Sequence, residues 1–284
     1  MFSDFGVNFQ DLASLWLVIM AVVAMCCFLV SEFTRNYSQV DKMWSLMPIV
    51  YSMITLASSP SPRVWMMASL VTVWGLRLSY NFYRKGGYHI IPWKGAEDYR
   101  WQVVRKHPML KGRLRFGLFN LLFISLYQHL LILLFSTPIL LASAFPDKSL
   151  TYLDYIAAFL MLTFIITESI ADNQQYRFHQ EKHNPGTNEG RYSSSLKQGF
   201  LTEGLWRYAR HPNFASEQGI WISFYFFGVA ASGQWVNFTA LGAILLVLIF
   251  MGSTRLTESL SSQKYPGYAA YQQEVPKFIP RFRK

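Results

Sequence analysis

The chain has 284 residues, of which 52% are hydrophobic and 17% aromatic, and its formal net charge is +10. Only 15% of the residues are charged, whereas a soluble domain carries about a quarter. This composition argues against an ordinary soluble protein and favours one integral membrane domain over residues 1–284 that crosses the bilayer several times.

Long apolar stretches separated by charged blocks predict an all-α bundle of seven membrane helices, because lipid offers no partner to bare peptide groups. The first span is expected to remain as an anchor, since the N-terminus carries Asp4 and Asp11 and lacks the basic segment of a cleaved signal peptide. The fourth is expected to bend or end near Pro138. In chain order the spans cover about 12–30, 43–58, 64–82, 117–140, 150–171, 215–232 and 235–253.

Basic residues gather in alternate connections between these spans. The third–fourth and fifth–sixth connections and the C-terminal segment are rich in lysine and arginine, while the connections between them hold only Arg63 and Lys148. The positive-inside rule then places the N-terminus outside and the C-terminus in the cytoplasm. Because topology accounts for the basic excess, we expect no nucleic-acid partner.

The two large cytoplasmic connections cover about 83–116 and 172–212. The first is expected to be looped, with a short helix around Ala96–Lys106. The second should begin as a helical extension to Lys182, break at Asn184-Pro-Gly186 and continue as a polar loop to Gln198.

The segment GLWRYARHPNFASE, residues 204–217, precedes the sixth apolar run. Pro212 favours the first turn of a helix, so the sixth helix should begin within His211–Asn213, where free backbone N–H groups attract anions. Asn213 and Glu217 are four residues apart and share one helical face. A carboxylate at membrane depth is costly unless it is paired or used, so Glu217 is interpreted as functional.

Further polar residues lie in the spans or at their cytoplasmic ends. We expect them to converge with the 204–217 segment on one polar cavity, which would be a substrate or cofactor site. The alternative is that each is an ordinary interfacial cap or ion pair. These residues are Asp41, Trp44, Arg77, Tyr80, Glu168, Asp172, Asn173, Gln174, Arg255 and Glu258.

A metal site is not expected. His179 and His183 lie on one helix face, but the glutamate of the zincin motif does not follow the first histidine, and the other four histidines are scattered. Cys26 and Cys27 are adjacent and have no zinc spacing. No soluble nucleotide-binding motif is present either.

Five segments carry a resemblance to a known family. They resemble the steroid 5-alpha-reductase-like membrane family, most closely its bacterial DUF1295-type branch, and are more distantly similar to isoprenylcysteine carboxyl methyltransferases. The resemblance covers about residues 40–280, with segments in the family's order, which makes it fairly specific. The segments are VDKMW (40–44), VTVWGLRLSYNFYRKGGYHIIPWKGAEDYRW (71–101), IADNQQYRFHQEKH (170–183), GLWRYARHPNFASE (204–217) and YPGYAAYQQEVPKFIP (265–280).

The resemblance implies a seven-helix bundle that uses NADPH to reduce a carbon–carbon double bond conjugated to a carbonyl, in a steroid-like or other lipid. Arg207, Arg210 and His211 would hold phosphates. Asn213 and Glu217 match the positions that orient the nicotinamide. The remaining cofactor-binding candidates are Arg77, Asp172, Asn173, Arg255 and Glu258.

Polarising the carbonyl oxygen requires an acid. In the steroid reductases it is a carboxylate of the second span with a tyrosine of the third, so Asp41 and Tyr80 are the nearest candidates. The chain departs from the family at two places: Trp74 occupies the expected tyrosine position, and Ser216 replaces the glycine of His-Pro-Asn-Tyr-x-Gly-Glu.

Three functions stay open at this point. Asn213 and Glu217 favour the reductase. A membrane methyltransferase that binds S-adenosylmethionine shares the Arg-His-Pro signature, but its paired glutamates are missing, since Glu258 stands alone. A non-catalytic protein could keep the same scaffold. The expected location is the bacterial inner membrane or the endoplasmic reticulum.

Overall fold

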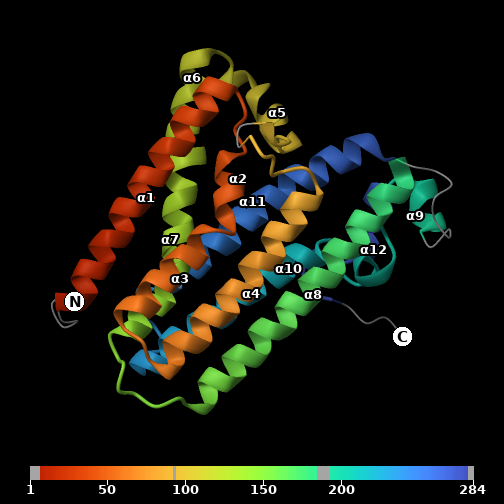
Figure 1. The fold of residues 1–284 in the computed structure, drawn as a ribbon. Coiled ribbons are helices and arrows are strands. Elements are labelled where there is room, and N and C mark those ends of the chain that lie inside the picture. The colour runs from red at the N-terminus through yellow and green to blue at the C-terminus, as the bar shows by residue number, and fades with distance from the viewer. Residues whose placement is uncertain (1–6, 92–93, 184–191, 281–284) are drawn as a thin grey trace. The chain divides into compact units, whose positions relative to one another are not determined.

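A computed structural model describes residues 7–91, 94–183 and 192–280, and every regular element within these ranges is a helix (Figure 1). Four helical segments are long and apolar enough to cross a membrane, which is consistent with an integral membrane protein. They are Phe9–Thr34, Arg113–Ser143, Tyr152–His183 and Ala240–Lys264. The chain divides into two compact units, Met1–Ala158 with Ser223–Leu245, and Phe159–Ile222 with Leu246–Lys284.

The first unit is built around a few packed helices. Helix α3 packs against α4 and α7, and α1 packs against α7 and the π-helical segment Asn120–Tyr127. In the core, Trp16 stacks on Tyr51 with ring centroids 4.5 Å apart. The helices of this unit are α1 (Val7–Thr34), α2 (Gln39–Trp44), α3 (Met47–Ser58), α4 (Pro62–Arg84), α5 (Tyr99–Arg105), α6 (Arg113–Phe119) and α7 (Gln128–Ser143).

Arg63, which the sequence placed in a connection between spans, is buried at the start of α4 and forms an ion pair. Its guanidinium is 1% exposed and forms a two-pronged ion pair with Asp154, with Nε to Oδ1 at 2.7 Å and Nη2 to Oδ2 at 3.0 Å. It also donates to the carbonyls of Lys148 and Ser149. Four of the five N–H donors of this buried cation are thus matched, as burial of a charge requires.

Pro138 neither ends nor breaks its helix, since α7 continues to Ser143. Proline has no N–H, so the Leu134 carbonyl, four residues earlier, loses its usual donor. The Thr137 hydroxyl donates to that carbonyl at 2.6 Å and replaces the missing bond. Gly242 packs against the same turn: a Cβ there would lie 2.3 Å from the Leu134 carbonyl.

The second unit contains most of α8 (Tyr152–His183) with α9 (Ser193–Gln198), α12 (Tyr268–Glu274) and parts of α10 (Pro212–Ser232) and α11 (Ala240–Lys264). Two aromatic clusters fill its interior. Phe178, Tyr192, Leu201 and Trp206 form one cluster, and Phe200, Tyr268 and Tyr271 form the other.

Several local predictions are confirmed. Helix α10 begins at Pro212, α8 extends beyond Lys182 to His183, and α5 lies within the predicted short helix. The expected polar loop up to Gln198 is wrong at its end, because residues 193–198 form α9, which Gly199 terminates with a φ of +86°. The predicted break at Asn184-Pro-Gly186 lies outside the described residues.

Helices occupy all seven predicted spans, but they differ in length. Helix α3 has 12 residues and is therefore about 18 Å long, well short of the roughly 30 Å of a hydrocarbon core. Helices α4 and α10 also fall outside the four most apolar segments. The count of seven spans and the orientation of the termini stay predictions.

Candidate functional site

Glu258 is the centre of a buried polar cluster in the second unit. Its Oε1 accepts hydrogen bonds from Arg210 Nε at 2.7 Å and from His211 Nε2 at 3.0 Å. Its Oε2 accepts from Gln272 Nε2 at 3.2 Å and lies 3.9 Å from Lys277 Nζ. The side chains of Arg210 and Glu258 are each 8% exposed. The Glu258 carboxylate therefore pairs with the Arg210 guanidinium and accepts two further side-chain hydrogen bonds in a largely buried setting.

The same cluster fastens the C-terminal segment to the start of α10. The Arg210 guanidinium donates to the carbonyls of Gln272 and Val275. The backbone N–H groups of Arg210 and His211 donate to the carbonyls of Pro276 and Lys277. A phosphate approaching these two residues would have to compete with bonds that are already made.

Asn213 and Asp172, two of the predicted site residues, meet in this unit. The Asn213 amide donates to Asp172 Oδ1 at 3.4 Å, and Asp172 is 3% exposed. The Oδ1 of Asn213 is buried and has no hydrogen-bond partner. A buried amide oxygen without a donor costs about 1–3 kcal/mol, so this atom suits a ligand that brings an N–H group.

Glu217 and Ser216 are buried in the first turns of α10. Glu217 is 4% exposed, and its Oε1 accepts from the Trp221 indole at 3.1 Å. Ser216, at the family's glycine position, is 2% exposed and donates to the Pro212 carbonyl at 2.8 Å. The serine hydroxyl is therefore satisfied inside its own helix.

A pocket of about 600 Å³ lies elsewhere in the second unit, and neither Asn213 nor Asp172 nor Glu217 lines it. One face of α8 supplies residues at helical spacing, and Gly204, with a φ of +65°, supplies a turn. A side chain at that glycine would overlap Gln174, whose Oε1 accepts from the Leu205 N–H at 2.9 Å. The lining residues are Ile170, Asn173, Gln174, Arg177, Tyr192, Glu203 and Gly204.

Sequence reasoning did not assign Arg177 or Glu203 to a site. Arg177 is four residues after Asn173, so helical spacing alone would have placed both on one face. Glu203 accepts from the Ser195 hydroxyl at 3.1 Å, a contact that depends on α9, which was predicted as loop. Two other candidates, Arg207 and Arg255, are exposed.

The remaining candidates belong to the first unit. Asp41 Oδ2 accepts from the Trp101 indole at 3.0 Å. Burial raises the pKa of the Asp41 carboxyl, and the nearby Arg100 only partly opposes this. Tyr80 is 63% exposed, whereas Trp74 is fully buried. Arg77 is half-buried on α4. No contact among the described residues joins Tyr80 to Asp41.

The sequence is similar to known proteins over nearly its whole length. A family model described as "Protein of unknown function (DUF1295)" matches residues 27–275. A protein of the fission yeast Schizosaccharomyces pombe, described as uncharacterized, is 37% identical over 292 aligned residues, which cover 99% of this chain and 83% of the yeast protein. No solved structure matches the chain.

Proposed function

We propose that this chain, which belongs to the DUF1295 family, is a multi-pass membrane reductase. It would use NADPH to reduce a carbon–carbon double bond conjugated to a carbonyl in a steroid-like or other lipid. The observation that carries the proposal is the partly buried Asn213–Asp172 pair, whose buried and unpartnered amide oxygen lies in the same unit as a pocket of about 600 Å³.

The residues of the second unit fit a dinucleotide. The free Oδ1 of Asn213 would accept an N–H of the nicotinamide carboxamide, and Arg177 would face a phosphate from the pocket wall. Arg207 is exposed and would also contact a phosphate of the cofactor. Arg210 and His211 would act by holding the start of α10 in place. NADPH, when bound, supplies a hydride to the substrate.

Asp41 fits the role of an acid that protonates or polarises the substrate carbonyl. Because burial raises its pKa, Asp41 keeps its proton to a higher pH than an ordinary aspartate does. The Trp101 indole fixes the direction of one carboxyl oxygen. The exposed ring of Tyr80 makes Asp41 the better supported of the two predicted acids.

A ligand titration tests the proposal. NADPH, NADH and S-adenosylmethionine would each be added to the purified protein in detergent while thermal unfolding is followed. A ligand that binds only the folded state at a hundred times its Kd stabilises it by about 2.7 kcal/mol. We expect NADPH to stabilise the protein and S-adenosylmethionine to have no effect. The reverse result would support the methyltransferase, and no effect from any ligand would support a scaffold.

Two variants locate the site. Asn213→Ala and Glu217→Gln should each abolish stabilisation by NADPH while the protein stays folded. Gln263→Ala, on the exposed face of α11, is the matched control and should leave it intact. Unchanged NADPH affinity in both site variants would remove these residues from the cofactor site.

A further inference from the structure

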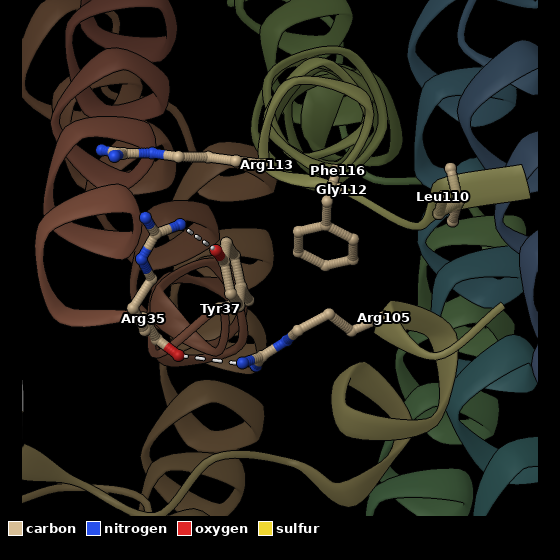
Figure 2. Close-up of a pocket in the computed structure, with 7 residues that line it drawn as sticks. All are labelled: Arg35, Tyr37, Arg105, Leu110, Gly112, Arg113 and Phe116. Carbon is tan, nitrogen blue, oxygen red and sulfur yellow. Dashed lines mark hydrogen bonds between the residues drawn. The ribbon is translucent and has the colours of Figure 1, made fainter. Parts of the chain in front are cut away.

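A second pocket, of about 350 Å³, lies in the first unit, and no residue assigned to the reductase lines it (Figure 2). It lies where α1 ends at Thr34 and α6 begins at Arg113, which are the ends of two of the four segments able to cross a membrane. Three arginines from three parts of the chain line it. The lining residues are Arg35, Tyr37, Arg105, Leu110, Gly112, Arg113 and Phe116.

Two of the three arginines are held in position by neighbours. Arg105 Nη2 donates to both oxygens of Glu97, at 2.8 and 3.0 Å, and its guanidinium lies 4.7 Å from the centre of the Tyr37 ring. Arg35 Nη1 lies 3.3 Å from Glu32 Oε2 and donates to the Tyr37 hydroxyl at 3.2 Å. Figure 2 shows Arg105 reaching toward Tyr37 and Arg35.

The pocket retains unused donors. The Nε of Arg105 is buried without a hydrogen-bond partner. Arg113 is exposed and has no acceptor among the described residues. Three guanidinium groups face two carboxylates, so the pocket has a net positive charge.

The surroundings of the pocket are apolar as well as basic. Phe33, at the end of α1, is 88% exposed, and Leu114, beside Arg113, is 86% exposed. Met109, before α6, is 76% exposed. Large exposed apolar side chains next to cations are typical of a surface at the level of lipid headgroups. A soluble anion would gain nothing from them.

We propose that this pocket binds the phosphate headgroup of an anionic membrane lipid, with a phosphomonoester such as that of phosphatidic acid as the preferred form. Guanidinium groups match phosphate oxygens with paired N–H donors, and a phosphomonoester offers more charge than a diester. The lipid chains would lie against Phe33 and Leu114. The proposal requires membrane embedding but is independent of the reductase activity.

Arg113→Gln is the test variant, and Arg115→Gln is its matched control, since Arg115 is exposed on the same helix but does not line the pocket. The full chain would be purified in detergent and titrated with phosphatidic acid, phosphatidylserine, phosphatidylcholine and inorganic phosphate while thermal unfolding is followed. Phosphatidic acid should stabilise the wild type most. Arg113→Gln should weaken that effect about five-fold in apparent affinity, because one arginine near a charged lipid surface contributes about 1 kcal/mol.

Three results would overturn the proposal. Equal loss in Arg115→Gln would show that diffuse surface charge, rather than this pocket, attracts the lipid. Equal stabilisation by inorganic phosphate would show that the pocket takes a free anion. Equal stabilisation by phosphatidylserine and phosphatidic acid, unaffected by Arg113→Gln, would show that no phosphate site exists here. Retained stabilisation by NADPH in Arg113→Gln would separate this pocket from the proposed cofactor site.

Discussion

Replacing Glu258 with glutamine should destabilise the second unit more than replacing an exposed residue of the same segment does. The substitution keeps the size of the side chain and one carbonyl oxygen but removes the charge that faces Arg210 and His211. Both partners of the Arg210–Glu258 pair are only 8% exposed, so water cannot replace the lost charge. Breaking a buried pair by removing one partner costs about 3–5 kcal/mol.

The assay is thermal unfolding in detergent, followed by tryptophan fluorescence. At about 2–4 °C per kcal/mol, the Glu258→Gln variant should unfold about 6–20 °C lower than the wild type. Glu274→Gln removes an exposed carboxylate from α12 and is the control, which should change stability by less than about 0.5 kcal/mol. If the two variants unfold together, the buried pair does not stabilise this unit and Arg210 is free to bind phosphate.

Three further perturbations test other parts of the fold. Gly242→Ala should destabilise the protein by about 1–3 kcal/mol in the same unfolding assay, because its Cβ would overlap the backbone of α7. Gly252→Ala, on the same helix with nothing near its added Cβ, should instead stabilise by about 0.5–1 kcal/mol. Asp154→Asn leaves the buried Arg63 guanidinium without a charged partner and should lower the free energy of unfolding by about 3–5 kcal/mol. An unchanged midpoint of thermal unfolding would contradict a stabilising role of that ion pair. The raised pKa of Asp41 means that the wild type loses stability as pH rises from the ordinary aspartate value of 3.8 through the higher folded value. The melting temperature of Asp41→Asn should therefore rise relative to that of the wild type as pH increases. A difference that does not change with pH would contradict this.

Local signals in the sequence predicted local structure well. Pro212 marks the start of α10 because its fixed φ and missing N–H suit the first turn of a helix. The apolar stretches likewise indicated where helices lie, although not all of these helices are as long as a bilayer span. Of the two effects predicted for Pro138, an end of the helix does not occur, because a hydroxyl one residue earlier replaces the missing donor; a bend stays a prediction.

The candidate site was less predictable, because its contacts join residues far apart in the chain. Sequence alone named Arg210, His211 and Glu258 but assigned them to a cofactor. Their pairing with one another across 47 or 48 residues depends on where the residues just before α10 meet α11. Arg63 was missed for the same reason, since Asp154 lies 91 residues away.

The distance between Arg210 and its partners has a consequence for biosynthesis. Arg210 leaves the ribosome 48 residues before Glu258 and 65 residues before the Val275 carbonyl. At about 5–20 residues per second, the nascent chain holds this cation uncompensated for about 2–10 s before its carboxylate is made. During that interval Arg210 lacks its carboxylate partner, so the buried cluster at the start of α10 can close only after α11 and the segment that follows it have been made.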